Sequence, residues 1–534
     1  MTQRGVTKCI LRFCNALFIK KREVTCLAEE NGNAIELKKI TKTFGTVVAN
    51  DKIDLSVKRG EILALLGENG SGKTTLMNML SGIYHPDSGS IFVNGEKVLI
   101  NSPHDAKALG IGMIHQHFKL VDVFNAMENV VLGSNEKQRR PKVLKEKILE
   151  ITARFELDVD PEKKIYNMSV SERQTVEILK VLYQGADILI LDEPTAVLTP
   201  QETRKLFVIL KKMREQGSAV IIITHKLHEV MEISDRVTIL RKGKSIGTVT
   251  TATTNEKELT EMMVGRPVTL AIDRPVCQNV HTSLKIVDLT VMKEDGSIGL
   301  NDISFELKAG EILGVAGVAG SGQKELCEAV AGLRKIKTGA ILYQKESIVG
   351  KTPKEISRLG ISMSFVPEDR LGMGLVASMG MVNNMLLKTY DQSKGIFIDR
   401  KPAKEMSEML VNQLDIQTPG VETPVRLMSG GNVQKVLLGR EIASHPSVLI
   451  TAYPVRGLDI NSSYMIYDLL NEQKKKNVAV LFIGEDLDVL LQLSDRLMVL
   501  CNGKVTGIVD AKTASKEEIG LLMTGIKGKG AKAG

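Results

Sequence analysis

A chain of 534 residues is too long for a single hydrophobic core, and its length predicts two to four domains. Its 43% hydrophobic and 25% charged residues are typical of a globular protein, and no apolar run reaches the roughly 18 residues needed to cross a bilayer. The net charge of +8 comes from the two ends, +5 in residues 1–23 and +3 in residues 526–534. The body is therefore nearly neutral, which argues against nucleic-acid binding.

Residues 1–30 read as an N-terminal extension. The apolar stretch 9–19 is interrupted by Arg12 and lacks the unbroken core and cleavage site of a signal peptide. We predict that the extension is disordered or precedes the true start, with an amphipathic surface segment as the alternative. The six cysteines form no C-x-x-C pair, which predicts reduced thiols and argues against a metal site.

The first chemical motif is a glycine-rich loop between an expected buried strand, residues 62–66, and an expected helix from residue 76. Glycines let backbone N–H groups turn around a phosphate, while Lys73 reaches the β- and γ-phosphates and the Thr74 hydroxyl binds Mg²⁺. The pattern predicts a nucleoside triphosphatase. The candidate binding residues are Gly67, Asn69, Gly70, Ser71, Gly72, Lys73, Thr74 and Thr75.

Two later apolar strands end in candidate catalytic residues. Residues 188–191 precede Asp192 and Glu193, and residues 221–223 precede Thr224 and His225. Asp192 would join the Mg²⁺ shell, and Glu193 would orient the attacking water. Strands of one parallel sheet end at the same edge, so we expect His225 to contact a γ-phosphate there, with a structural histidine as the alternative.

The chain repeats itself. Residues 59–63 return 250 positions later, and Ser234-Asp235-Arg236 returns 260 positions later. The repeat predicts a first copy at residues 31–266 and a second copy at residues 283–525. The segment 267–282 contains Pro267 and Pro275 and reads as a linker, and residues 526–534 form a basic tail.

The order of motifs in the first copy resembles the nucleotide-binding domain of ATP-binding cassette (ABC) proteins. The glycine-rich loop is followed by Gln116, by Ser169 at 23 residues before Asp192, and by the strand-ending His225. The resemblance implies an α/β P-loop NTPase fold of the ABC type, with two tandem nucleotide-binding domains that each carry a helical subdomain, and with ATP and Mg²⁺ as ligands.

Two copies without membrane spans resemble the ATP-binding subunit that powers importers for simple sugars and nucleosides. The amino-acid sequences of residues 112–120 and 186–199 resemble the nucleoside importers more than the ribose importers. The resemblance implies a peripheral ATPase on the cytoplasmic face of a bacterial membrane. Its partners would be integral-membrane permease subunits, contacted after Gln116, and indirectly an extracytoplasmic solute-binding protein.

The resemblance also assigns roles to single residues. It implies that Phe44 stacks on adenine, for which a core phenylalanine is the alternative. It adds Gln116 to Thr74 and Asp192 as a Mg²⁺ contact, and to Glu193 and His225 as a catalytic group.

The second copy departs from the first at the positions that carry the chemistry, and no aromatic residue there matches Phe44. The P-loop lysine and threonine, the glutamine, both acids and the histidine are all replaced. Their counterparts are Gln323, Lys324, Glu368, Ala452, Tyr453 and Glu485.

The signature sequence shows the opposite asymmetry. The second copy has Ser429, Gly430 and Gly431, whereas the first has Ser171 for the second glycine and then Glu172. Glu172 would repel a phosphate, or it could simply stabilise a helix start. ABC domains sandwich ATP between one P-loop and the other signature, so this resemblance implies one competent and one degenerate site.

Two other functions remain open from the sequence. A soluble tandem ABC protein acting on ribosomes would also lack membrane spans, although such proteins generally keep two competent sites and a long charged linker. A purely structural module is the second, and it conflicts with the complete motif set that begins at Lys73.

Overall fold

The computed structural model describes residues 32–115, 118–133, 141–196, 198–267, 272–278, 280–318, 320–365, 374–390, 398–456 and 458–525. Gln116, Glu368, the extension 1–30 and the tail 526–534 lie outside the described residues. The chain divides into two compact units, one of residues 1–194 and 205–265 and one of residues 195–204 and 266–534.

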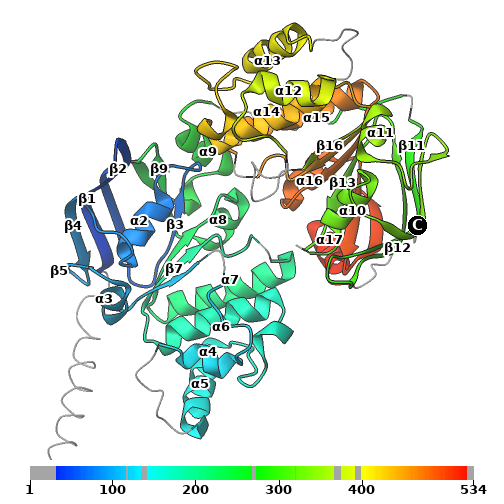
Figure 1. Cartoon of the computed structure of the whole chain (residues 1–534). Coiled ribbons are helices and arrows are strands. Elements are labelled where there is room, and N and C mark those ends of the chain that lie inside the picture. Colours follow the sequence, from blue (N-terminus) through cyan, green and yellow to red (C-terminus); the bar gives the residue numbers. More distant parts are fainter. Residues whose placement is uncertain are drawn as a thin grey trace, which may run out of the picture. The chain divides into compact units, whose positions relative to one another are not determined.

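The first copy is built on a six-stranded sheet of order β10-β9-β3-β8-β7-β6, drawn from blue to green in Figure 1. All pairs are parallel except the β9–β10 hairpin. All five residues of β3 are buried, as expected of a strand covered on both faces. The strands are β3 (Ile62–Leu66), β6 (Ile111–Ile114), β7 (Ile188–Asp192), β8 (Ala219–Ile223), β9 (Arg236–Arg241) and β10 (Lys244–Thr250).

A second, antiparallel sheet of order β2-β1-β4-β5 belongs to the same copy. Alternate residues of β2, namely Ile53, Leu55 and Val57, are buried, which is the pattern of a sheet with one face on the core. The β1–β2 hairpin closes with Phe44 opposite Val47. The strands are β1 (Asn33–Phe44), β2 (Val47–Lys58), β4 (Ser88–Val93) and β5 (Glu96–Val98).

The helices of the first copy include the expected helical subdomain, in which α4 and α5 pack on α6 (Figure 1). Among the described residues, no helix combines the length and apolar character needed to span a membrane. The helices are α2 (Lys73–Leu80), α3 (Pro103–Ala108), α4 (Ala126–Val131), α5 (Pro141–Phe155), α6 (Val170–Tyr183), α7 (Pro200–Glu215), α8 (Leu227–Ile233) and α9 (Glu256–Val264).

The second copy repeats both sheets strand for strand. Its orders are β16-β17-β18-β13-β19-β20 and β12-β11-β14-β15, the same connectivity as in the first copy. The predicted tandem α/β fold is therefore confirmed. The strands are β11 (Thr282–Met292), β12 (Ile298–Lys308), β13 (Ile312–Ala316), β14 (Ile336–Tyr343), β15 (Glu346–Ser347), β16 (Ile361–Phe365), β17 (Val448–Ala452), β18 (Ala479–Ile483), β19 (Arg496–Cys501) and β20 (Lys504–Asp510).

The helices of the second copy likewise include a helical subdomain, in which α13 packs on both α12 and α14. Its apolar contacts form a separate small core that contains Met381, Leu410 and Val433. The helices are α10 (Gln323–Val330), α11 (Pro353–Arg358), α12 (Met381–Thr389), α13 (Lys401–Gln413), α14 (Gly430–Ala443), α15 (Ile460–Lys475), α16 (Leu487–Leu493) and α17 (Lys516–Met523).

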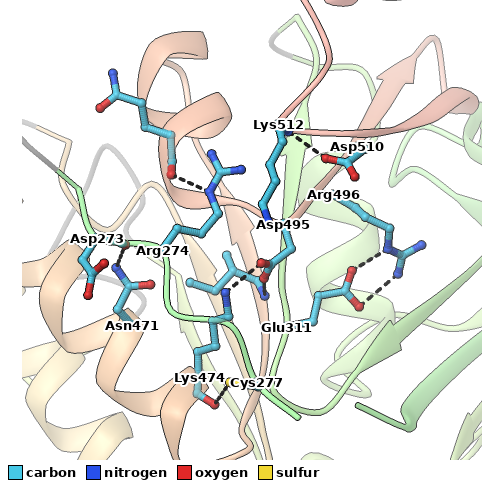
Figure 2. A network of polar contacts seen from close by, with 12 residues as sticks. Asp273, Arg274, Cys277, Glu311, Asn471, Lys474, Asp495, Arg496, Asp510 and Lys512 are labelled. Carbon is cyan, nitrogen blue, oxygen red and sulfur yellow. Dashed lines mark hydrogen bonds and ion pairs between the residues drawn. The ribbon is translucent and has the colours of Figure 1, made fainter. Parts of the chain in front are cut away.

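Residues 272–278, which we call the strap, lie in the predicted linker and pack on the second copy (Figure 2). The Arg274 guanidinium donates to the carbonyl of Gln492 at 3.0 Å and to that of Leu491, at the end of α16. Asn471 donates to the Asp273 carbonyl at 2.5 Å, and the Cys277 thiol donates to a carbonyl of α15 at 3.4 Å. The strap thus supplies donors to carbonyls in the last turns of α15 and α16 and accepts one hydrogen bond from α15.

Candidate phosphate-binding and catalytic site

The glycine-rich loop runs from the end of β3 into α2, as the sequence predicts. Gly72 has φ 98°, and a Cβ there would lie 2.4 Å from the Ala49 carbonyl oxygen and 2.5 Å from Asn50 Nδ2. Only glycine fits this left-handed, enclosed position. The Asn50 amide also donates to the Gly72 carbonyl at 3.2 Å, so the start of β2 holds the loop.

The Lys73 ammonium lies inside the loop. Its Nζ donates to the carbonyls of Gly67 at 2.7 Å and Glu68 at 3.0 Å, and the residue is only 9% exposed. Burial lowers the pKa of Lys73, while the negative charges of Glu193 and Asp192 act in the opposite direction. A buried cation flanked by inward-turned backbone suits the binding of a phosphate group.

The remaining loop residues are arranged around this ammonium. Ser71 is buried, and its Oγ has no hydrogen-bond partner among the described residues. Asn69 and Gly70 form the exposed turn, and Thr74 and Thr75 begin α2 with Thr74 exposed. An unpaired buried hydroxyl and an exposed threonine are polar groups that a bound nucleotide and its metal ion could satisfy.

Asp192 and Glu193 stand at the carboxyl end of β7. Burial, and then the adjacent Glu193 charge, raises the pKa of Asp192 to about 6. A carboxylate destabilised in this way gains from a nearby cation, which fits the predicted Mg²⁺ shell. Glu193 adopts φ 46°, unusual for a residue other than glycine, and its N–H donates to the Ile223 carbonyl at 2.8 Å.

The ends of β7 and β8 bring Glu193 and His225 together. Asp192 is paired with Ile223 in the parallel ladder, and His225 follows two residues later. His225 Nδ1 lies 3.1 Å from Glu193 Oε1. This hydrogen bond is the main reason that the pKa of Glu193 is lowered, so the carboxylate stays ionised near neutral pH.

Gln174 was not among the predicted site residues, yet it connects α6 to this edge of the sheet. Its Nε2 donates to the Pro194 carbonyl, one residue after Glu193, at 2.8 Å. In the second copy the equivalent Gln434 donates to the Arg456 carbonyl at 2.6 Å, two residues beyond Pro454, which is the counterpart of Pro194. The sequence feature that could have indicated this residue is a glutamine at the same position of both copies, Gln174 and Gln434, 260 positions apart.

The two signature segments begin helices in different ways. In the first copy Ser169 and Glu172 form a capping box, in which the Glu172 carboxylate accepts from the Ser169 N–H at 2.8 Å. Lys163 Nζ lies 2.6 Å from the same carboxylate. The charge of Glu172 is thus largely engaged within its own helix start, which supports the helix-stability interpretation.

In the second copy the signature serine and glycines open α14. Gly430 is its first residue and Gly431 its second, and the Ser429 hydroxyl accepts from Asn432 Nδ2 at 2.9 Å. No acidic residue lies in the first turn of this helix. Apart from the Ser429 cap on the Asn432 N–H, the positive end of this helix is not offset by an acidic side chain in its first turn.

The corresponding edge of the second copy has different polar contacts. Gln323 donates to the Val318 carbonyl at 3.2 Å, and Lys324 lies 3.7 Å from Glu328. Tyr453 keeps the left-handed backbone, with φ 55°, and Glu485 pairs with Arg456 at 3.5 Å. These residues offer neither the buried ammonium nor the paired acids of the first copy.

Phe44 lies at the tip of the β1–β2 hairpin. It is 43% exposed, which argues against the alternative of a core phenylalanine. The hairpin approaches the glycine-rich loop through Ala49 and Asn50, which lie against Gly72. The location is compatible with a stacking platform beside a nucleotide.

A groove of about 410 Å³ opens in the first copy beside His115. Its lining includes Met113, His115, Lys119, Glu177 and Lys180, from β6, the following segment and α6. Glu177 accepts from the Lys119 N–H at 2.7 Å, and burial raises the pKa of Glu177. The groove thus combines apolar walls with buried and exposed charges.

Comparison with known proteins places these features in context. The ABC transporter family matches residues 50–196 and 300–454. The nucleoside import ATP-binding protein NupA of Lactococcus lactis subsp. cremoris is 43% identical over 501 residues, covering 93% of this chain and 99% of that protein. The guanosine import ATP-binding protein NupO of Bacillus subtilis is 44% identical over 497 residues, covering 92% and 97%.

The chain also resembles a solved structure, and at this low sequence identity the resemblance concerns the fold alone. The archaeal ribosome recycling factor aABCE1, in complex with the ribosomal stalk protein aP1, matches 88% of this chain and 90% of its own, with a TM-score of 0.58 and 19% identity.

Proposed function

Because the chain belongs to the ABC transporter family, we propose that it is the ATP-hydrolysing subunit of an importer for nucleosides or simple sugars. The observation that carries the proposal is the grouping of Lys73, Asp192, Glu193 and His225 around one glycine-rich loop. The import-protein relatives at 43% and 44% identity favour nucleosides as solutes, and they disfavour the ribosomal alternative.

The first copy supplies the groups that bind the triphosphate. Backbone N–H groups of residues 70–74 and the Lys73 ammonium hold the β- and γ-phosphates, with Lys73 leaving the carbonyls of Gly67 and Glu68. Thr74 and Asp192, with Gln116 from outside the described residues, would hold Mg²⁺. The ion, when bound, neutralises phosphate charge.

Hydrolysis depends on the pair at the ends of β7 and β8. Glu193 accepts a hydrogen bond from the attacking water and aligns it for in-line displacement. His225 holds the Glu193 carboxylate through their 3.1 Å contact and faces the γ-phosphate. Gln174 positions the segment through the Pro194 carbonyl, which keeps Glu193 in its left-handed backbone conformation.

The signature of the second copy completes this site in our proposal. Ser429, Gly430 and Gly431 open α14, whose N-terminal end carries no acidic side chain. In a closed state these groups would cap the γ-phosphate bound to the first copy. The other composite site would combine Gln323 with a signature that contains Glu172, and we propose that it does not turn over.

We further propose that the groove beside His115 receives a permease subunit. Its apolar lining and its mixed charges at Lys119, Glu177 and Lys180 suit an amphipathic segment of a partner. The protein would then act at the cytoplasmic face of the membrane, and a solute-binding protein would reach it only through the permease.

ATP hydrolysis by the full chain tests the site assignment. We expect Lys73→Ala and Glu193→Gln each to abolish turnover, because they remove the phosphate-binding cation and the water-orienting carboxylate. Gln323→Ala, at the matching position of the second copy, should retain most of the activity. Equal losses in all three variants would refute the asymmetry.

A reconstitution experiment tests the transport assignment. The ATPase rate is measured for the chain alone and with a candidate permease in vesicles, with and without nucleoside-loaded binding protein. We expect stimulation only in the complete system. Co-sedimentation with ribosomes, without stimulation by a permease, would instead support the ribosomal alternative.

A further inference from the structure

An aromatic pair joins the β1–β2 hairpin to the segment after α2. Phe44 and Tyr84 meet edge to face, with ring centroids 5.2 Å apart and an interplanar angle of 70°. Their separation lies in the range of attractive aromatic pairs. Because Tyr84 is 36% exposed and Phe44 43%, the pair lies at the surface rather than in the core.

Asp87 fixes the backbone immediately before Phe44. Its Oδ2 accepts from the Thr43 N–H at 2.7 Å and from the Thr43 hydroxyl at 2.6 Å, and its Oδ1 accepts from Lys42 Nζ at 2.7 Å. The hydrogen bonds from Lys42 and Thr43 lower the pKa of Asp87 to about 2. The carboxylate is therefore ionised under all assay conditions near neutral pH.

These residues are located beside the phosphate loop. The strand that leaves the hairpin tip reaches Asn50 within a few residues, and the Asn50 amide donates to the Gly72 carbonyl. Tyr84 is reached from the other end of α2, which starts at Lys73. The Phe44 ring thus lies between the hairpin, which contacts the loop through Asn50, and the segment after α2, the helix that begins at the loop.

The second copy provides an internal comparison. In the first copy Thr41 of β1 pairs with Ser88 of β4, and in the second copy Thr290 of β11 pairs with Thr338 of β14. Thr290 is therefore the counterpart of Thr41, and Lys293, three residues later, is the counterpart of Phe44. The counterparts of Tyr84 and Asp87, 250 positions later, are Arg334 and Lys337.

In the second copy, polar contacts of Arg334 take the place of the aromatic pair. Arg334 donates to the Met292 carbonyl at 3.0 Å and to Glu328 at 2.6 Å, so the hairpin is still tied to the segment after the helix. The fold therefore does not require the aromatic pair. The pair occurs in the copy that has the P-loop lysine, and both rings are replaced in the copy that lacks it.

We propose that Tyr84 and Asp87 are positioning residues that hold Phe44 as a platform for the purine base of the bound nucleotide. This inference rests on the proposed ATP site at Lys73. Tyr84 fixes the ring by its edge-to-face contact, and Asp87 fixes the backbone of Thr43. A preordered ring loses less conformational entropy when a base stacks on it, which increases affinity for the nucleotide.

The proposal concerns the base and not the phosphates, which gives a discriminating test. Binding of ATP and of inorganic triphosphate is measured by calorimetry on the full chain, for the wild type and for Tyr84→Ala, Tyr84→Phe and Asp87→Asn. We expect Tyr84→Ala and Asp87→Asn to weaken ATP binding about three- to tenfold and to leave inorganic triphosphate unchanged. Tyr84→Phe keeps the ring and should restore ATP affinity.

Two controls separate the possible failures. Arg334→Ala, the matched position of the second copy, should leave ATP affinity unchanged. The proposed ATP site itself fails if the wild type binds neither ligand or if Lys73→Ala has no effect. If Lys73→Ala abolishes binding but Tyr84→Ala and Asp87→Asn match the wild type, or lose both ligands equally, the positioning role is wrong.

Kinetics give a second readout. In ATP hydrolysis by the full chain, we expect Tyr84→Ala to raise KM for ATP by the same factor while kcat changes less than twofold, because stacking of the base is the same in the ground and transition states. A fall in kcat at constant KM would contradict the proposal.

Discussion

The requirement for glycine at position 72 is the sharpest constraint on a single residue. Gly72→Ala would place a Cβ 2.4 Å from the Ala49 carbonyl in a left-handed backbone, whereas Gly185→Ala meets nothing within 4 Å at φ 87°. We expect the first change to abolish ATP binding and to cost about 2 to 4 kcal/mol of stability. The second should cost about 1 kcal/mol and leave binding intact. Chemical unfolding and calorimetry measure both, and equal effects would contradict this account.

We expect the buried Cys327 thiol to make the second copy less stable at alkaline pH. Burial raises its pKa from 9.0 to about 12 in the folded protein. Above pH 9 the unfolded chain releases the proton while the folded chain retains it, so the free energy of unfolding falls as pH rises, by up to about 1.4 kcal/mol per pH unit.

The check is urea unfolding of the wild type and Cys327→Ala between pH 8 and 10.5. The difference in stability between the two proteins should be constant below pH 9 and should shift against the wild type above it. Parallel curves across the whole range would show that the thiol does not titrate differently in the two states.

At the scale of elements, variants at the start of α6 can decide whether Glu172 stabilises the helix or repels a phosphate. Glu172→Ala removes the capping box and the contact with Lys163, and we expect it to lower the stability of the first copy by about 1 kcal/mol. Glu172→Gln keeps a capping side chain without the charge. If Glu172 acts only as a helix cap, we expect Glu172→Gln to retain wild-type stability and ATP turnover.

The measurement is thermal unfolding together with the ATPase rate for both variants. A marked rise in turnover with Glu172→Gln, at unchanged stability, would instead favour phosphate repulsion by the carboxylate.

The elements that the sequence predicted best are those defined by local patterns. The apolar runs before Gly67, Asp192 and Thr224 became β3, β7 and β8, because a strand buried on both faces needs no information beyond its own residues. The grouping of Glu193 with His225 followed from one rule, that neighbouring parallel strands end at the same edge.

Contacts between distant segments could not be predicted in the same way. The Phe44–Tyr84 pair joins residues 40 positions apart, and neither residue has a local signal for the other. The bond from Gln174 to the Pro194 carbonyl depends on how α6 packs against the sheet. Side chain to backbone contacts of this kind leave no pattern in a single sequence, apart from the repeat of the glutamine.

At the scale of the whole chain, the strap contributes to the stability of the second copy. Pro267 and Pro275 suggested only a linker, yet Arg274 donates to the carbonyls that end α16. We expect Arg274→Ala to destabilise the second copy by about 1.5 to 3 kcal/mol, because these are charge-assisted hydrogen bonds. Lys504→Ala, an exposed change in the same copy, serves as the control.

Differential scanning calorimetry of the full chain resolves this prediction. The transition assigned to the second copy should move to lower temperature in Arg274→Ala and stay in place in Lys504→Ala. An unchanged transition in Arg274→Ala would mean that the strap follows the second copy without stabilising it.

The left-handed backbone at Tyr453 has a consequence for the engineering of the second copy. Like Glu193, Tyr453 donates its N–H at 2.8 Å to an isoleucine carbonyl of the neighbouring strand, so the two copies share this backbone turn and differ in the side chain that it carries. Tyr453→Glu would therefore place a carboxylate on the same kind of turn that carries Glu193, with the backbone at this position already in the conformation of the first copy.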